Sequence, residues 1–456
     1  MKILIINGSP AGENSITLQT MKYLEIRYPE HEYRVLHAAR RIKAIEKDFS
    51  ETEDLVLWAE LVVFAYPVYT FLAPSQLHRL IDLLKQSGLD FSGKFATQLS
   101  TSKHFYDSTA HEYIRENCLD LGFSYLPGLS QDMEDLLTEQ GRKDARMFFE
   151  HLMFSVDQGF CEKKDPDNSS EQPLVLYRAT VPDLSAEKKS EKRVVLVADL
   201  ESGNDRLLSM VQRFQAVLPY ECTLVNIAEF PFAGGCLGCF HCASDGKCVY
   251  KDGFDSFLRE RIQSGDSIVY AFSVKDHSMG VRFKMYDDRQ FCNGHRTVTM
   301  GSPTGYLVDG AMSREENLRI MLHARAGVGG NYLAGIACSE DASVDQAIDR
   351  LAAELSYALE HGYTQPADFY GAGGKKIFRD LIYQMQGLMK EDHRFYKRRG
   401  FYDDFPQKHK GKILAMYLVG GMMRNKKLQK KLGGRMTEGM MMPYQKMLEK
   451  ARQGKL

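Results

Sequence analysis

MKILIINGSPAGENSIT, residues 1–17, joins a short apolar run to a Gly-Ser-Pro turn and then to polar residues that are typical of a helix start. The run 2–7 is short and almost wholly apolar, which indicates a strand buried on both faces. A strand, a polar turn and a helix make the first half of a βαβ unit. The stretch therefore predicts an α/β fold on a parallel sheet.

The same pattern continues along the chain and then occurs a second time. The helix after the third apolar run has apolar residues at i, i+3, i+4 and i+7, which form one buried face. The alternation of strand and helix then continues to about residue 130. We expect two flavodoxin-like, doubly wound parallel sheets of five strands in tandem, since the second series keeps the same element order. The expected strands are 2–7, 32–36, 61–66, 95–100 and 123–129, then 193–198, 222–227, 267–272, 304–308 and 332–336.

Length and charge indicate further parts. A chain of 456 residues with 44% apolar content is too long for one ordinary core. Its net charge of −1 hides a basic end, because residues 371–456 hold 21 Lys and Arg against 7 Asp and Glu. We expect this mainly helical extension to dock within the chain or between subunits, an anionic surface being the alternative. The expected parts are a first domain 1–160, a linker 161–192 rich in Pro, Ser and charges, a second domain 193–365 and a tail 366–456.

A cysteine quartet, CLGCFHCASDGKC, lies in the second domain. Cys236, Cys239, Cys242 and Cys248 have the spacing C-x2-C-x2-C-x5-C, which resembles the ferredoxin loop that holds an iron–sulfur cluster. Structural zinc sites usually consist of two separated C-x2-C knuckles, and no second knuckle is present. We interpret the four cysteines as ligands of an iron–sulfur cluster. The alternatives are a zinc site and thiols that are redox-active or merely structural.

Polar and aromatic residues follow three strands of the first domain, at the sheet edge where ligands of open α/β folds bind. The turn and helix start at Ser9, Asn14 and Ser15 offer donors to a phosphate. The third and fourth strands end in YPVYTF and STSKHFY. Loop packing and helix capping are the alternative roles of these residues.

With these motifs in view, the first domain resembles the NADPH-dependent FMN reductase family, which has a flavodoxin-like fold. GSPAGENS matches the family's phosphate loop, and YPVYTFLAPSQLHRLID matches its ring loop and the helix after it. The family often has Asp-Arg in that helix, whereas Asp82 is followed here by Leu83. The resemblance implies that the FMN phosphate is held by Ser9, Pro10, Asn14, Ser15 and Ile16. It implies that one side of the flavin ring is bordered by Pro67, Val68, Tyr69, Thr70 and Phe71. The other side would be covered by Ser100, Thr101, Ser102 and the loop to Tyr106.

The second domain resembles the iron–sulfur flavoproteins, relatives of the same reductases. The cysteine spacing agrees in full, and Asp288-Arg289 matches the family's Asp-Arg. The resemblance implies a [4Fe-4S] cluster on the four cysteines. The flavin loops of this half depart from the family, so we expect the stretch around Asn204 to be a polar loop and helix cap, and Lys275 and His277 to be solvated loop residues.

Together these resemblances imply an FMN-dependent NAD(P)H oxidoreductase that passes electrons to a quinone, a nitro compound or a similar small acceptor. Tyr69, His104 and Tyr106 are the candidate catalytic residues. A reduced ferredoxin is an alternative donor, and a homo-oligomer is implied. A non-enzymatic carrier that docks on a protein partner and a zinc-stapled flavoprotein are the competing functions.

The sequence also bears on location and on other partners. No secretory apolar region opens the chain and no apolar run is long enough to span a membrane, so we expect a cytoplasmic protein. No nucleic-acid-binding module is recognisable, so no nucleic-acid partner is expected.

Overall fold

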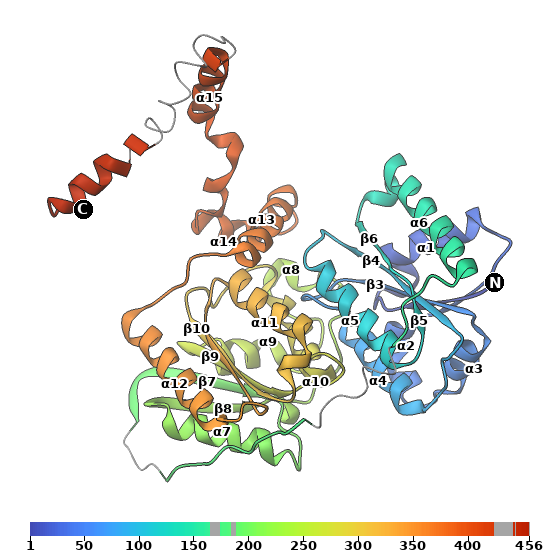
Figure 1. The fold of residues 1–456 in the computed structure, drawn as a ribbon, viewed down its shortest axis with the longest axis horizontal. Coiled ribbons are helices and arrows are strands. Elements are labelled where there is room, and N and C mark those ends of the chain that lie inside the picture. Colours follow the sequence, from blue (N-terminus) through green and yellow to red (C-terminus); the bar gives the residue numbers. More distant parts are fainter. Residues whose placement is uncertain (165–173, 184–187, 424–440, 443, 456) are drawn as a thin grey trace. The chain divides into compact units, whose positions relative to one another are not determined.

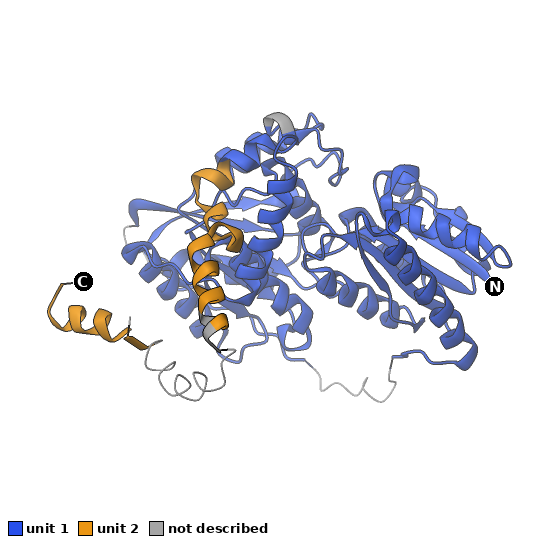
Figure 2. Cartoon of the chain, turned by 90° about the horizontal axis from the view of Figure 1, so that it is seen from above, with its two compact units in different colours: residues 1–394 blue, residues 395–456 orange. Residues whose placement is uncertain are grey.

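The computed structural model describes residues 1–164, 174–183, 188–423, 441–442 and 444–455. The chain forms two compact units, residues 1–394 and 395–456 (Figure 2). The first unit holds both parallel sheets (Figure 1). The predicted fold class is thereby confirmed.

The first sheet has the strand order β2-β1-β3-β4-β5, which is the flavodoxin-like order. The predicted fifth strand is in two pieces that both pair with β4, because Pro127 lacks an amide hydrogen and Gly128 lies against Gln98 with no room for a side chain. The remaining predicted strands of this sheet are confirmed. The bounds are β1 Lys2–Asn7, β2 Glu32–Leu36, β3 Leu61–Pro67, β4 Phe95–Ser102, β5 Ser124–Tyr125 and β6 Leu129–Asp132.

The second sheet has the order β11-β10-β9-β7-β8, which is the same topology counted from the other edge. All of its described pairings are parallel. Val194, Val195, Leu196 and Val197 of β7 are fully buried, so the strand is covered on both faces as in other parallel sheets. The bounds are β7 Lys189–Ala198, β8 Tyr220–Asn226, β9 Ser267–Ser273, β10 Pro303–Asp309 and β11 Tyr332–Cys338.

Helices cover both faces of each sheet, and the two inner layers meet (Figure 1). In the first domain α1 and α6 form the outer layer and α4 and α5 the inner one, while in the second domain α7 and α12 are outer and α10 and α11 inner. Helix α4 contacts α10 and α5 contacts α11, and one apolar core runs through both inner layers. The bounds are α1 Ile16–Arg27, α4 Ser75–Ser87, α5 Asp107–Asp120, α6 Glu139–Gln158, α7 Asp205–Val217, α10 Gly280–Arg289, α11 Glu316–Gly329 and α12 Val344–His361.

The remaining helices are shorter or lie near the C-terminus. No helix among the described residues is both long and apolar enough to cross a bilayer. The bounds are α2 Ala38–Ile45, α3 Ser50–Trp58, α8 Cys242–Asp245, α9 Phe254–Ser256, α13 Phe369–Gln384, α14 Lys390–Arg398 and α15 Lys410–Met423.

Part of the expected linker lies on the second domain. The Tyr177 amide donates to the Ser339 carbonyl at 2.6 Å, and the Thr180 amide donates to Asp345 at 2.9 Å. Ala179 is buried in the outer core of the second sheet. Residues 165–173 and 184–187 of the linker lie outside the described residues.

Helix α13 uses the GAGG motif for close packing. A Cβ atom on Gly371 would lie 2.7 Å from the Gly327 carbonyl oxygen of α11, and one on Gly374 would lie 2.5 Å from Val328 and 3.0 Å from Phe105. The glycines therefore let α13 approach both α11 and the loop after β4. This role fits the absence of the Gly-Lys-Ser/Thr ending that a phosphate-binding Walker loop requires.

Gly374→Val should displace α13 from the first domain. The added side chain would overlap Val328 and Phe105, and overpacking of this kind typically destabilises by about 1–3 kcal/mol. Urea denaturation of the full chain measures the change. Gly373→Val is the matched control, because a Cβ there meets nothing within 4 Å. Equal losses in the two variants would contradict the packing role of Gly374.

Candidate functional site

The predicted phosphate loop lies between β1 and α1. Ser15 is the N-cap of α1, and its Oγ accepts from the Leu18 amide at 3.3 Å. Ser9 is buried, and its Oγ accepts from the Ala11 amide at 3.3 Å. The first amides of a helix have no acceptor within the helix, so α1 presents free donors and a positive dipole end where the sequence predicts a phosphate. Asn14 is exposed beside them.

The predicted ring loop turns sharply after β3. Thr70 and Phe71 have φ angles of 43° and 72°, in the left-handed region that L side chains rarely adopt. Reciprocal main-chain hydrogen bonds of 2.8 and 3.1 Å between Tyr69 and Leu72 hold this turn. Such strained turns cluster at functional sites. Burial raises the pKa of Tyr69, so its phenol stays protonated across the physiological range.

The third loop follows β4 and meets the other two. Thr101 Oγ1 lies 2.6 Å from Thr17 Oγ1 of α1, which ties this loop to the phosphate loop. The ring centroids of Phe71 and Tyr106 are 4.7 Å apart, which ties it to the ring loop. The three predicted loops therefore converge at the carboxyl edge of the first sheet, where Ser100 and Ser102 are also buried.

The three candidate catalytic residues have different surroundings. His104 is about half exposed, and its Nδ1 lies 2.8 Å from Asp107 Oδ2. The Tyr106 hydroxyl donates to the Tyr370 carbonyl of α13 at 2.7 Å, and Phe105 stacks on Phe378 of the same helix at 4.2 Å. Helix α13 therefore covers this side of the loop. Tyr69 faces the second domain instead.

The cysteine quartet lies on the segment between β8 and α9. Cys236 is nearly buried, and this burial raises the pKa of its thiol to about 12, whereas Cys239 is exposed. The Gly238 amide donates to Cys236 Sγ at 3.5 Å, and Cys242 Sγ donates to the Phe291 carbonyl at 3.2 Å. Across the described residues, no three of the four thiols come within 4.8 Å of one another.

Arg289 clamps both ends of this segment. Its guanidinium donates to the Gly234 carbonyl at 2.9 Å before the quartet, and to the two Asp252 carboxylate oxygens at 2.9 and 2.7 Å after it. It also lies over the rings of Tyr250 and Phe254. Arg289 itself is almost completely buried, so the conformation of the cysteine segment depends on a desolvated ion pair.

The structure places the cysteine segment directly against the ring loop of the first domain. The Gln76 amide donates to the Cys236 carbonyl at 3.0 Å, and a Cβ on Gly238 would lie 2.0 Å from the Tyr69 hydroxyl. The Tyr69 ring also meets Phe291 edge to face at 5.7 Å. Gly238 is therefore required for the close approach of the Tyr69 phenol.

A buried ion pair on α10 supports this contact, and the sequence interpretation missed half of it. Lys284 pairs with Asp288 and also donates to the Tyr69 carbonyl at 2.6 Å. Asp288 accepts from the Ser75 amide at 2.8 Å, and burial raises its pKa to about 6 against the opposing effect of Lys284. The available signal was a Lys and an Asp at i, i+4 on the inner face of a buried helix.

The loop after β9 repeats the geometry of the ring loop. Lys275 and Ser278 exchange two main-chain hydrogen bonds of 2.9 Å, and Asp276 and His277 have φ angles of 49° and 56°. The expectation that His277 is solvated is wrong: its Nε2 lies 2.9 Å from Asp120 of α5, and its Nδ1 lies 3.0 Å from Glu315. His277 packs against the first domain instead, whereas Lys275 is exposed, as expected, and pairs with Glu201 at 2.9 Å. Asn204 caps α7, as expected.

His277 should make stability depend on pH. Burial alone would lower its pKa, but hydrogen bonds to Asp120 and Glu315, with the nearby Glu116 carboxylate, raise the pKa of His277 to about 10. Because the folded pKa lies above the unfolded value of about 6.5, this stabilisation is complete below pH 6.5 and is lost as pH rises through 10.

His277→Gln should therefore lower the free energy of unfolding by about 2 kcal/mol near pH 6 and by much less above pH 10. Urea denaturation across this pH range measures the difference. His361→Gln, on the exposed end of α12, is the control. A deficit of His277→Gln that stays constant with pH would contradict the charged pairing.

One comparison with known proteins agrees with the fold of the first domain. Residues 1–114 match a family described as having a flavodoxin-like fold. No curated protein matches the sequence. Among solved structures, an NADH:FMN oxidoreductase in its apo form is 19% identical, with 38% of this chain and 99% of that chain covered and a TM-score of 0.31.

Two further solved structures are similar to parts of the chain. A putative quinone reductase from Klebsiella pneumoniae is 17% identical, with 36% of this chain and 87% of that chain covered and a TM-score of 0.26. An NAD(P)H:quinone oxidoreductase from Methanothermobacter marburgensis is 15% identical, with 32% and 91% covered and a TM-score of 0.27.

Proposed function

We propose that the protein is a flavin-dependent oxidoreductase that holds FMN on the three converging loops of the first domain and a [4Fe-4S] cluster on the cysteine quartet. The observation that carries this proposal is the contact of the Cys236–Gly238 turn with Tyr69 and Gln76. A flavin loop and a candidate cluster loop in direct contact are arranged for electron transfer between them. NAD(P)H is the proposed donor, and a quinone or a similar small molecule is the proposed acceptor.

The residues of the first domain fit FMN at its phosphate end. The free amides at the start of α1, with Ser9 and Ser15 beside them, suit a phosphate dianion. Glu13 lies near but is paired with Lys22 and His37, so its charge is compensated locally. When bound, FMN would exchange two electrons with a hydride donor and single electrons with a one-electron partner.

The side chains of the third loop are arranged to handle a proton and to exclude water. His104 is oriented by Asp107 through Nδ1, so that its Nε2 is free to hold or receive a proton. Ser130 donates to the same Asp107 carboxylate at 2.6 Å and fixes its position. Phe71, Phe105 and Tyr106 form an aromatic cluster that would exclude water from this side of the loop when a ligand is bound.

The spacing of the quartet favours a cluster over a single zinc ion. Structural zinc sites usually consist of two separated C-x2-C knuckles, whereas three of these cysteines follow one another at successive x2 intervals, as in the cluster loop of ferredoxins. The Gly238 amide already donates to Cys236 Sγ, which is the kind of donor that cluster sulfurs accept.

One observation favours an electron carrier as the second candidate. Cys239 is exposed, and Leu237 and Phe240 on the same turn are apolar and exposed as well. An apolar rim around a candidate cluster ligand is suited to docking of a redox protein. In this alternative the chain would exchange electrons with that protein, such as a ferredoxin, instead of with a small acceptor.

Anaerobic purification followed by quantification of FMN, iron, sulfide and zinc per chain tests the cofactors. We expect FMN together with about four iron and four sulfide per chain. Steady NADPH oxidation with a soluble quinone would support the enzyme, whereas reduction only by reduced ferredoxin would support the carrier. Zinc without sulfide would overturn the cluster, and absence of FMN would overturn both flavin functions.

A further inference from the structure

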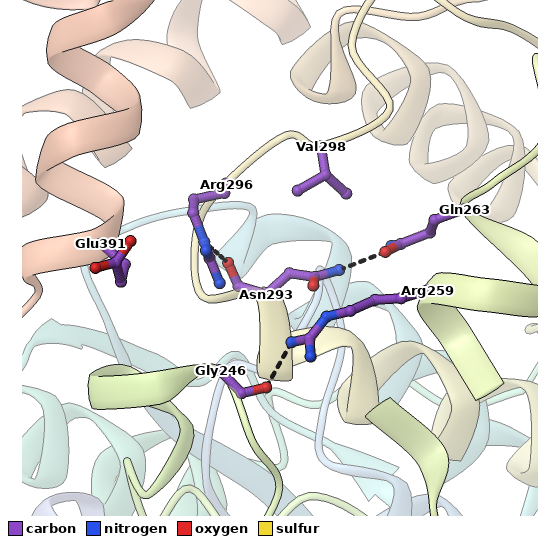
Figure 3. Close-up of a pocket in the computed structure, with 7 residues that line it drawn as sticks. All are labelled: Gly246, Arg259, Gln263, Asn293, Arg296, Val298 and Glu391. Carbon is purple, nitrogen blue, oxygen red and sulfur yellow. Dashed lines mark hydrogen bonds between the residues drawn. The ribbon is translucent and has the colours of Figure 1, made fainter. Parts of the chain in front are cut away.

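A cavity of about 470 Å³ lies beside the cysteine segment (Figure 3). Its volume is in the range of small-molecule sites. None of the residues predicted to bind FMN lines it. Its wall is mostly polar and is formed by Gly246 of the cysteine segment, Arg259, Gln263, Asn293, Arg296, Val298 and Glu391.

Two guanidinium groups converge on one point of this wall. A Cβ atom built on Gly246 would lie 2.9 Å from Nη2 of Arg259 and 3.6 Å from Nη2 of Arg296. Gly246 has a φ of 74° and keeps this point free of a side chain. An oxyanion at this point would lie within reach of both guanidinium groups and would be stabilised by them.

The hydrogen bonds of the cavity leave positive charge at its wall. Within the set of described side chains, Arg259 donates only to main-chain carbonyls, those of Gly246 and Cys292. Arg296 donates to the Asn293 carbonyl at 2.7 Å and pairs with Asp392 at 3.2 Å. Glu391 is paired with Arg394. Among the described residues, the Arg259 guanidinium therefore forms no ion pair with a carboxylate.

Amide side chains complete the donor set. Asn293 is buried and donates to the Gln263 side-chain oxygen at 3.1 Å (Figure 3). This bond uses the oxygen of Gln263 and leaves its amide nitrogen as a donor at the cavity wall. A guanidinium pair with a neighbouring amide donor matches the planar or tetrahedral oxygens of a carboxylate or phosphate. The wall offers little apolar surface other than Val298.

We propose that this cavity binds a small molecule through a carboxylate or phosphate group, held between Arg259 and Arg296. The anion would lie against Gly246 of the cysteine segment, at the point that both guanidinium groups approach. The binding step stands independently of the flavin and of the cluster. It is an oxyanion site separate from the three flavin loops.

Isothermal titration calorimetry of the full chain with inorganic phosphate, and separately with succinate, tests the site at constant chloride. We expect at least one anion to bind, and Arg259→Gln and Arg296→Gln each to weaken binding about tenfold or more, the usual effect of losing a charge-assisted hydrogen bond. Arg261→Gln is the matched control, because Arg261 lies on the same helical turn but is exposed and outside the cavity. Phosphate binding alone would assign a phosphate ester, and succinate binding alone would assign a carboxylate.

Two further measurements keep the proposal falsifiable. Thermal unfolding shows whether each variant is folded. If Arg259→Gln does not fold, Arg259→Lys replaces it, because lysine keeps the positive charge but lacks the planar guanidinium. Arg259→Lys should bind the anion with an affinity between those of the wild type and Arg259→Gln. Iron and sulfide per chain show whether the arginines instead balance the thiolates. No binding of either anion to the wild type, equal binding in Arg259→Gln and Arg261→Gln, or a loss of iron without a change in anion binding would overturn the proposal.

Discussion

Cys242→Ser should lose most of the iron and sulfide that we expect the wild-type chain to retain under anaerobic conditions, and with them the visible absorption of the proposed cluster. Serine is close to cysteine in size and keeps a hydroxyl within reach of the Phe291 carbonyl, which lies 3.2 Å from Cys242 Sγ, so the segment should keep its conformation. It replaces a soft thiolate with a poor ligand for iron. Iron, sulfide and spectrum per chain are the measurements.

Cys161→Ser is the matched control for this variant. Its Sγ also donates to a main-chain carbonyl, that of Gly159 at 3.5 Å, but it lies outside the quartet. Flavin content should be unchanged in both variants, because the proposed flavin loops belong to the first domain. Equal iron content in the two variants would show that Cys242 is not a ligand.

Arg289→Met should produce the largest loss of stability among the substitutions considered. The variant removes a buried guanidinium, breaks three hydrogen bonds and leaves Asp252 partly buried without its partner. Breaking one partner of a buried ion pair lowers the free energy of unfolding by about 3–5 kcal/mol. Urea denaturation measures this loss, and hydrogen exchange should show faster opening of residues 234–252 than in the wild type.

The double variant Arg289→Met with Asp252→Leu distinguishes the stability that comes from the Arg289–Asp252 ion pair from the stability that comes from the packing of Arg289. Removing both charges takes away the unpaired carboxylate, so the double variant should recover part of the stability lost by Arg289→Met alone. Arg261→Gln should change stability by less than about 0.5 kcal/mol, as exposed substitutions usually do. No recovery in the double variant would mean that Arg289 acts through packing on Tyr250 and Phe254 instead of through Asp252.

The sequence predicted the sheets more accurately than the loops. Buried parallel strands are continuous apolar runs, so β1, β3 and β9 could be recognised from local residues. The break between β5 and β6 depends on how closely Gly128 approaches Gln98, which is a contact between segments and has no local pattern. His277 was misplaced for the same kind of reason: its partner Asp120 is 157 residues away in sequence.

The candidate site, like the fold, could be predicted only in part from the sequence. The phosphate and ring motifs of the first half and the cysteine spacing of the second half are both visible in the sequence, but as two separate sites. The clamp by Arg289, the contact of Tyr69 with Gly238 and the convergence of Arg259 and Arg296 all join residues that are distant in sequence. None of these contacts could be predicted from periodicity or spacing.

By itself the sequence determined the α/β fold of each half, because apolar periodicity is a local property, and the spacing of the four thiols indicated metal ligands. Only the tertiary structure decided that the cysteine segment of one half lies on the ring loop of the other. The physical reason is that an amphipathic helix specifies that one face will be buried, not which surface buries it. Here α4 and α5 are buried against α10 and α11, and that choice brings the two candidate cofactor loops into contact.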